Sequence, residues 1–235
     1  MSSQAPPVAP RDVEHLRDLI GRLRAVAAPG RRTIVGVVGE PGAGKSTLVA
    51  ELVDALGPDA APAPMDGFHL SNKVLDDLGL RERKGAPETF DAHGFVQLLE
   101  RLRDQREDVV YAPEFLREHD ESIAARIAIS RDTPVVLVEG NYLLLDEHPW
   151  LEVRRHLDTV WYLDLDHDER LRRLADRHRS FGRAEAQAWE RARTHDQVNA
   201  ELVRRTRVRA DLVVRADGEG AGSVAADEVR PSSRG

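Results

Sequence analysis

The sequence predicts an α/β fold: a parallel sheet covered by helices on both faces. Three short apolar runs, at 33–38, 134–138 and 159–163, have the composition of fully buried strands. Segments with the apolar spacing of helices lie between and around them, as at 93–107. Buried strands that alternate with helices are typical of parallel sheets, because each crossover places a helix on one face.

The N-terminal elements follow one another at short intervals. Apolar residues at helical spacing predict a helix over 11–27, which a Pro-Gly pair ends. The strand at 33–38 leads through a glycine-rich turn into a helix over 46–56. Residues 58–64 alternate proline and alanine, which is typical of a loop or of a weak strand.

The remaining elements are less regular. Residues 67–92 are rich in glycine, proline and charge, and a loop of that length is usually functional or disordered. Residues 108–132 fit neither the helical nor the strand period and are left unassigned. Helices are expected over 167–181 and 184–205, followed by a short strand at 211–214.

Length and composition favour one folded domain. The chain has 235 residues, of which 41% are hydrophobic and 32% charged. We expect a single domain over 11–216, between disordered segments at 1–10 and 217–235. No apolar run approaches the ~20 residues of a membrane helix, and the N-terminus lacks the apolar core of a signal peptide. We therefore expect a cytoplasmic protein that does not bind membranes.

Charge and cysteine content exclude or disfavour several functions. The net charge is −7, from 34 Lys and Arg against 41 Asp and Glu, which argues against a dedicated nucleic-acid binder. The chain has no cysteine, which excludes disulfides, thiolate zinc sites and cysteine nucleophiles. Its 9 histidines form no H-E-x-x-H pattern, so we expect no zinc site.

A phosphate-binding loop is predicted between the first strand and the helix after it. The pattern G-x-x-x-x-G-K-[ST] is matched by Gly39, Glu40, Pro41, Gly42, Ala43, Gly44, Lys45, Ser46 and Thr47. Its glycines let successive backbone N–H groups point at a polyphosphate, and the helix N-terminus adds positive potential. Lys45 is expected to reach the outer phosphates and the Ser46 hydroxyl to bind Mg²⁺. The alternative is a glycine-rich turn with a chance Lys-Ser pair.

Two carboxylates are predicted beside this loop. Asp66 follows the weak strand and Glu139 follows a strong one, and open parallel sheets bind ligands outside the carboxyl ends of their strands. Phosphoryl transfer to an alcohol needs one carboxylate near the acceptor hydroxyl and another group that holds Mg²⁺. The alternative for each acid is a turn carboxylate that caps a neighbouring helix.

Arginines crowd the helix over 167–181 and its exit. A charged run of this kind is usually a solvated face. Arg173 and Arg177 lie one turn apart on a shared face. From a mobile segment over the phosphates, such arginines would neutralise transition-state charge and exclude water. Arg177 is the first candidate for that role, and the solvated face is the alternative.

Five stretches together resemble one kinase family. They are Gly39–Thr47, Met65-Asp66-Gly67-Phe68-His69, Arg83–Asp91, Val138-Glu139-Gly140-Asn141-Tyr142 and Asp196–Ala200. Over about residues 30–215 the chain resembles the phosphoribulokinase/uridine kinase/bacterial pantothenate kinase family, and it is most similar to the branch named nucleoside/nucleotide kinase family protein. The D-G-F-H and R-K-G-x-P-E-x-x-D motifs in this order are much more specific than the phosphate loop.

The resemblance implies a P-loop kinase fold with a five-stranded parallel sheet, helices on both faces and an arginine-rich lid. It also implies ATP and Mg²⁺ as cofactors, and transfer of the γ-phosphoryl group to a hydroxyl of a small molecule. By position, Asp66 matches the family's base and Glu139 its acid at the end of the second nucleotide-binding strand. Arg177, within a residue or two, matches its lid arginines.

The same resemblance implies that the long loop borders the acceptor pocket. The residues assigned to the acceptor on this basis are Asp66, His69, Arg83, Lys84, Glu88, Asp91, Asn141 and Asn199. The two asparagines lie in matching stretches without an assigned role. One departure stands out: Phe115 is followed by Leu116, where the family often has an aspartate. A different acceptor or a weakened activity is therefore expected.

The leading hypothesis is an ATP-dependent kinase for a nucleoside or a sugar, including a sugar phosphate. A pantothenate kinase-like activity is the nearest alternative. A nucleotide-dependent regulatory protein and a degenerate kinase without transfer activity are kept as further alternatives. The expected partner is a small-molecule acceptor, and a homodimer is the protein partner left open.

Overall fold

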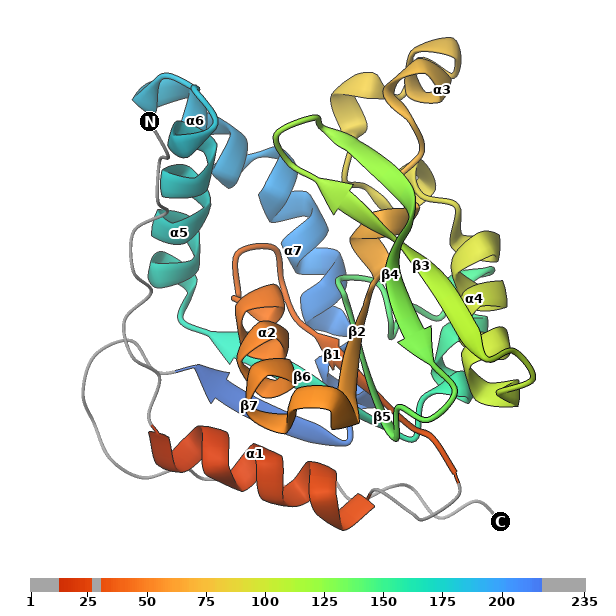
Figure 1. Ribbon diagram of the computed structural model, residues 1–235. Helices are drawn as coiled ribbons and strands as arrows, with labels where there is room; N and C mark the ends of the chain where they lie inside the picture. Colours follow the sequence, from red (N-terminus) through yellow and green to blue (C-terminus); the bar gives the residue numbers. More distant parts are fainter. Residues whose placement is uncertain (1–12, 27–30, 217–235) are drawn as a thin grey trace, which may run out of the picture.

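Five parallel strands form the central sheet, in the order β2-β5-β1-β6-β7 (Figure 1). The computed structural model describes residues 13–26 and 31–216. The strands of the sheet are β1 Thr33–Val38, β2 Ala60–Pro64, β5 Val135–Gly140, β6 Thr159–Leu165 and β7 Leu212–Ala216. A separate antiparallel hairpin consists of β3 Val109–Leu116 and β4 Glu121–Ser130.

Helices of two kinds connect these strands. The α-helices are α1 Val13–Val26, α2 Lys45–Leu56, α3 Asn72–Asp77, α4 Ala92–Asp104, α5 His167–Ser180, α6 Glu185–Arg193 and α7 His195–Arg205. The short 3₁₀ helices are η1 Gly57–Asp59, η2 Met65–Phe68, η3 Arg81–Arg83, η4 Pro87–Thr89, η5 Trp150–His156 and η6 Arg207–Arg209. In the described part of the chain, no helix has the length and apolar character needed to cross a membrane.

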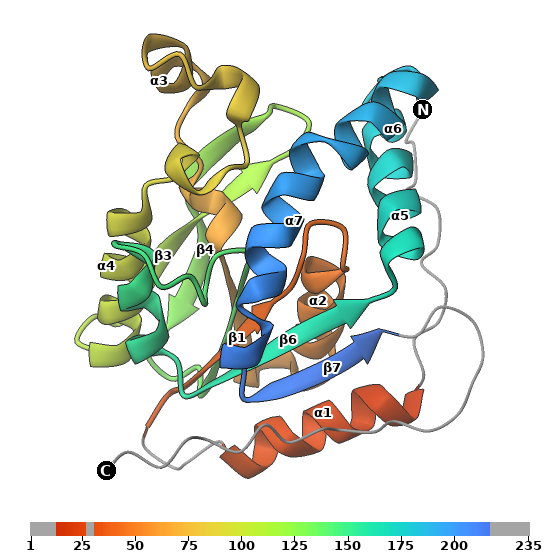
Figure 2. The same ribbon diagram turned by 180° about the vertical axis from the view of Figure 1, so that it is seen from behind.

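The predicted α/β fold is confirmed, with helices on both faces of the sheet (Figures 1 and 2). On one face, α1 and α2 pack against Val35 and Val37 of β1. On the other, α4, η5 and α7 pack in a cluster that contains Ile34 and Val38. Every residue of β1 is buried, because side chains on both faces of the strand meet helices. This two-sided burial is why the strand has an uninterrupted apolar sequence.

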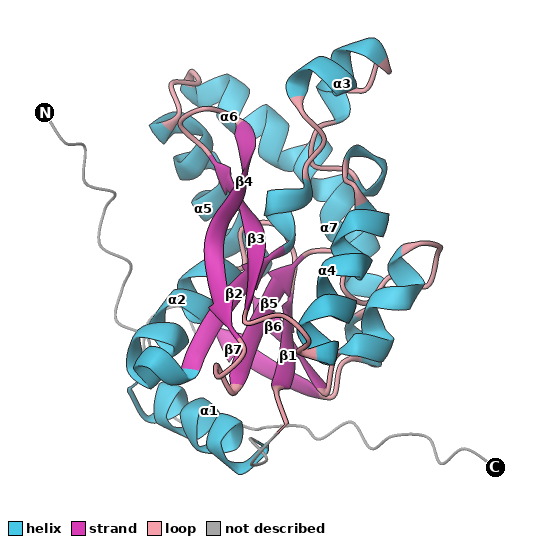
Figure 3. Cartoon of the chain, turned by 45° about the vertical axis from the view of Figure 1, so that its right-hand side comes forward, coloured by secondary structure: helices cyan, strands magenta, loops and turns pink. Residues whose placement is uncertain are grey.

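The segments without a clear sequence pattern, 58–64, 67–92 and 108–132, form the edge strand β2 and elements that follow it in the chain. The weak strand expected within 58–64 is β2 itself, and the irregular loop over 67–92 contains α3, η3 and η4. The unassigned residues 108–132 form the β3–β4 hairpin, which rises beyond the sheet in Figure 3. Most residues of β4 are exposed or half-buried, so the strand lacks the alternation of a half-buried strand.

The helix expected over 184–205 is two helices, so that prediction is wrong. Thr194 leaves helical geometry at φ −111° and ψ −85°, and α6 ends there while α7 begins. Its hydroxyl donates to the carbonyl oxygen of Glu190 at 2.8 Å, the back-bonding by which threonine bends helices. The expected segments at 1–10 and 217–235 lie outside the described residues.

Sheet register brings the predicted site residues together at one edge. β5 pairs with both β1 and β2, so that Val38 lies beside Gly140 and Pro64 beside Glu139. The phosphate-binding loop after β1 and the η2 turn after β2 therefore flank the end of β5. Asp66 lies in that turn. The carboxyl ends of three neighbouring strands thus converge on one place, as in other open parallel sheets.

Candidate active site

The loop Gly39–Thr47 depends on glycine at two positions. Gly42 and Gly44 have φ of 85° and 93°, in the left-handed region that glycine adopts without strain. A Cβ on Gly42 would lie 2.7 Å from Leu174 Cγ, so the loop also needs glycine to pack against α5. The N-cap residue of α2 is Gly44, which has no side chain that could cap the helix, and a helix N-terminus of this kind is suited to phosphate.

Lys45 is a buried cation held by oxygen atoms. Its ammonium donates to the carbonyl oxygens of Gly39 at 3.0 Å and Glu40 at 3.2 Å, and to Asn141 Oδ1 at 2.6 Å. Burial lowers the pKa of Lys45 to about 8, although Glu139 and Asp66 favour its charged form. An anion brought to this loop would compensate the buried charge. Asn141, which had no role from the sequence, therefore holds the lysine in place.

Glu139, near the end of β5, and Ser46, in the first turn of α2, bring two side-chain oxygen atoms together. The Ser46 hydroxyl donates to Glu139 Oε1 at 3.1 Å. Burial raises the pKa of Glu139 to about 7, and the negative charge of Asp66 adds to the effect. A hydroxyl and a carboxylate are the hard oxygen ligands that Mg²⁺ prefers, so these residues fit the predicted metal.

Asp66 lies across the sheet edge from this pair, surrounded by positive groups. Its Oδ2 is 3.7 Å from an Nη atom of Arg117, which stands just beyond the end of β3. Burial alone would raise the pKa of Asp66, but His69, Arg117 and Lys45 together hold it below its usual value. Asp66 is therefore ionised at neutral pH. Arg117 carried no predicted role; its only sequence signal is its position directly after the Leu116 departure.

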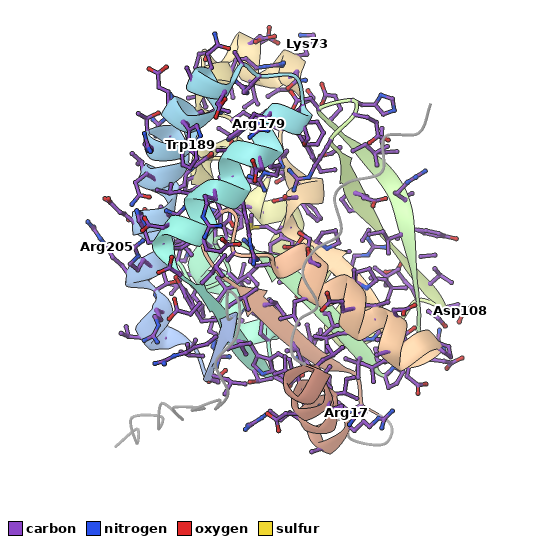
Figure 4. The ribbon with its side chains drawn as sticks, turned by 90° about the vertical axis from the view of Figure 1, so that its left-hand side faces the viewer. Arg17, Lys73, Asp108, Arg179, Trp189 and Arg205 are labelled. Atoms are coloured by element: carbon purple, nitrogen blue, oxygen red, sulfur yellow. The ribbon has the colours of Figure 1, made fainter. Side chains whose placement is uncertain are left out.

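The two candidate lid arginines are held differently. Arg173 Nε donates to Glu169 Oε1 at 2.7 Å within α5. The guanidinium of the half-buried Arg177 forms no hydrogen bond or ion pair with any described residue. Burial lowers the pKa of Arg177, and the positive charge of Arg117 lowers it further. Arg177 is close enough to interact electrostatically with Asp66 and Lys45, whereas Figure 4 shows the outer surface of α5 with Arg179.

A buried ion-pair cluster fixes the phosphate loop to the C-terminal helices. The Glu40 carboxylate accepts two hydrogen bonds from Arg204, at 2.8 and 3.0 Å, and lies 3.0 Å from Arg170 Nε. Arg170 is 1% exposed and also donates to Pro41 O at 3.3 Å and Gln197 Oε1 at 2.5 Å. The side chain of Glu40 thus points to α5 and α7, away from the cradle of the loop.

The residues predicted to contact the acceptor fall into two groups. Lys84 is nearly buried: its ammonium donates to Asn72 Oδ1 and to the Asp120 carbonyl oxygen, both at 2.6 Å. It also lies 4.9 Å from the centroid of the Phe115 ring. The His69 ring lies between Phe90 and Phe115, at centroid distances of 4.0 and 4.6 Å. These groups form a wall next to Asp66.

The other predicted acceptor residues have local partners. Arg83 and Glu88 form an ion pair at 2.5 Å. Asp91 Oδ1 accepts from the Gly94 amide at 2.8 Å and so caps α4. Asn199 donates to the Gly85 carbonyl oxygen at 3.3 Å. The Tyr142 hydroxyl donates to the same oxygen at 2.5 Å, so α7 and the segment after β5 both hold the loop at Gly85.

A cavity of about 450 Å³ lies between α2, β2 and the hairpin. Its lining includes Ser46 and Glu139, together with apolar residues such as Val49, Pro62 and Phe115. The two residues that fit Mg²⁺ therefore line the space between the sheet edge and the hairpin.

Comparison with known proteins places the chain among kinases. The sequence profile of the phosphoribulokinase / uridine kinase family matches residues 34–219. The chain belongs to this family. Its solved relatives include P-loop kinases, and this member shares their α/β fold with a five-stranded parallel sheet.

Three relatives of this kinase are informative. The Escherichia coli protein YggC is 38% identical over 200 residues, which cover 82% of this chain and 81% of YggC. A Schizosaccharomyces pombe protein named as a putative uridine kinase is 32% identical over 214 residues, which cover 86% of this chain and 91% of that protein. The crystal structure of a putative fructose transport system kinase from Silicibacter sp. TM1040 is 36% identical in sequence, with a TM-score of 0.77. The match covers 85% of this chain and 98% of that one.

Proposed function

We propose that this P-loop kinase transfers the γ-phosphoryl group of ATP to a hydroxyl of a small molecule, a nucleoside or a sugar. The observation that carries the proposal is the grouping of an ionised carboxylate, Asp66, with Lys45, Ser46 and Glu139 at the ends of three adjacent strands. Phosphoryl transfer to an alcohol needs these parts together.

The phosphate loop and its neighbours would hold the nucleotide. Lys45 and the backbone N–H groups of Gly39–Thr47 bind the phosphates, and Ser46 and Glu139 bind Mg²⁺. When bound, Mg·ATP supplies the γ-phosphoryl group with part of its charge neutralised. Asn141 positions Lys45 through its 2.6 Å hydrogen bond.

Asp66 would orient the acceptor hydroxyl and accept its proton. The proton moves to the carboxylate while the bond from the acceptor oxygen to the γ-phosphorus forms and the bond from that phosphorus to the bridging oxygen of ADP breaks. Arg177 stabilises negative charge on the transferred group from the α5 side. His69 and Lys84 shape the acceptor side of the site.

The names of two relatives support the choice of acceptor. The 32% identical relative is named for uridine and the 36% identical structure for fructose, so a nucleoside and a sugar are the first classes to test. A coupled assay of ADP release with Mg·ATP would screen nucleosides, hexoses and sugar phosphates.

Asp66→Asn is the decisive variant. It keeps the size of the side chain and removes the base, so acceptor-dependent ADP release should fall at least about 100-fold while ATP binding persists. Asp77→Asn is the control, because Asp77 is exposed on α3 and pairs with Lys73. Equal activity of Asp66→Asn and the wild type would contradict the assignment of the base.

A further inference from the structure

Arg117 is a cation next to the proposed base with unused hydrogen-bond donors. Its side chain is 42% exposed, and its single ion-pair contact within the described chain is Asp66 Oδ2 at 3.7 Å. At that distance the guanidinium does not hydrogen-bond the carboxylate, and none of its N–H groups donates to another described residue. A guanidinium has five N–H donors in a fork that matches a carboxylate or a phosphate.

Three acids of the hairpin, Glu114, Asp120 and Glu121, have partners other than Arg117, and Glu118, the next residue in the chain, forms no ion pair with it. Glu114 pairs with Arg126 at 3.0 Å. Asp120 pairs with Lys84 at 3.1 Å and with Arg81 at 3.4 Å. Glu121 accepts from the backbone amide of Asn72 at 2.9 Å. The preceding residue, Leu116, adds no carboxylate. Within the described chain, therefore, no acid of the hairpin forms an ion pair with Arg117.

Three fixed positive charges surround the reaction centre, and each comes from a different side. Lys45 belongs to the phosphate loop, Arg177 to α5 and Arg117 to the end of β3. Lys45 and Arg177 face the nucleotide side, where the phosphates bring their own negative charge. On the acceptor side, Lys84 is hydrogen-bonded to Asn72 and Asp120, whereas the guanidinium of Arg117 donates to no described residue. An anionic acceptor would pair with Arg117 and leave the Asp66 carboxylate free to act on the hydroxyl.

The two guanidiniums also act on each other. Burial is the largest cause of the lowered pKa of both Arg177 and His69; the charge of Arg117 lowers both further, and the charge of Lys84 also lowers that of His69. Like charges this close repel, and an anion between the hairpin and α5 relieves the repulsion. Lys84 adds positive potential, but Asn72 and Asp120 already accept its hydrogen bonds. Direct recognition of an anion is left to Arg117.

We propose that the acceptor carries an anionic group, a carboxylate or a phosphate, besides the hydroxyl that is phosphorylated, and that Arg117 binds this group. The inference rests on the proposed kinase function and narrows its acceptor to sugar phosphates or sugar-like hydroxy acids. Neutral nucleosides and free sugars would lack the group that Arg117 recognises.

Matched acceptors test the inference. ADP release would be measured with fructose against fructose 6-phosphate, which tests a phosphate, and with glycerol against glycerate, which tests a carboxylate; uridine is added as a neutral nucleoside. The wild type should give at least about tenfold higher kcat/KM with the charged member of one pair, since a hydrogen-bonded charge pair changes binding by roughly tenfold to a hundredfold.

Variants of Arg117 assign the effect to this side chain. Arg117→Gln should raise KM for the charged acceptor at least about tenfold and leave KM for ATP unchanged, with Arg117→Lys in between. Arg126→Gln is the control, because Arg126 lies on the same hairpin and is exposed. Both Arg117 variants should keep the wild-type melting temperature, because the Arg117 side chain is 42% exposed and its guanidinium makes no hydrogen bond with a described residue.

Other outcomes separate the two proposals. Turnover confined to neutral acceptors, with Arg117→Gln as active as the wild type, would overturn the anionic acceptor and leave the kinase function standing. An increase in KM for ATP as large as that for the acceptor would place Arg117 on the nucleotide and also overturn it. No ADP release above the ATP-only background with any acceptor would instead refute the proposed function.

Discussion

The ion-pair cluster at Glu40 allows a quantitative test of how the phosphate loop is held. Glu40→Gln keeps the shape of the side chain but removes the charge that compensates Arg170, which is 1% exposed. Breaking a buried pair by removing one partner costs about 3–5 kcal/mol. The contribution of Arg204 is smaller, because that side chain is 47% exposed. The glutamine still accepts a hydrogen bond, so we expect a loss of about 3 kcal/mol.

That loss is large enough to measure in two ways. For a chain of this size, about 3 kcal/mol corresponds to a fall in Tm of roughly 6–12 °C. The free energy of unfolding from urea titration, followed by circular dichroism, gives an independent value. KM for ATP should rise as well, since the loop loses its attachment to α5 and α7.

A matched control isolates the effect of burial. Glu107 accepts the same bidentate pair of hydrogen bonds from Arg101, at 2.8 and 2.7 Å, but both side chains are 45% exposed. Glu107→Gln should leave the urea midpoint close to that of the wild type, because solvent screens an exposed pair. If both variants had the same midpoint, the argument from burial would be refuted.

Three further predictions concern single side chains. Lys45→Met should abolish ATP turnover without lowering Tm, since the buried charge does not favour the fold; ADP release and a thermal melt would check both. Tyr142→Phe loses the hydrogen bond to the Gly85 carbonyl oxygen and should lower stability by about 1 kcal/mol while raising KM for the acceptor. Burial raises the pKa of Asp196, but the hydrogen bond and charge of His178, 2.7 Å away, outweigh it and hold that pKa below its usual value. The stability that this pair contributes is present above about pH 4 and is lost as the pH falls further. His178→Ala should therefore be less stable than the wild type at pH 7. Its free energy of unfolding, measured by urea titration, should also fall less than that of the wild type when the pH is lowered.

Local patterns explain what could be predicted from the sequence. The strand at 33–38 and the phosphate loop after it are contiguous, and their residue types follow from burial on both faces and from the backbone conformation around phosphate. Asp66 and Glu139 could be placed because parallel strands end at the same edge. These predictions needed no knowledge of long-range contacts.

What the sequence could not show depends on contacts between distant residues or on exposed strands. The hairpin is solvated along much of β4, so no alternation marks it. Glu40 and Arg204 are 164 positions apart, and no spacing rule relates them. Arg117 is near Asp66 only because the hairpin folds back over the η2 turn. Thr194 interrupts a helical pattern that otherwise runs on across α6 and α7.

The sheet order has a consequence for how such a chain can diversify. β2 and β5 are hydrogen-bonded neighbours, yet the chain between them, residues 65–134, contains η2, α3, α4 and the whole hairpin. One uninterrupted insertion therefore supplies Asp66, Lys84 and Arg117. The phosphate loop and α5 lie before and after it in the chain. An insertion between paired strands can change in length and sequence while the pairing persists. The residues proposed to contact the acceptor can therefore change together without a change in the strands that carry the proposed phosphate loop.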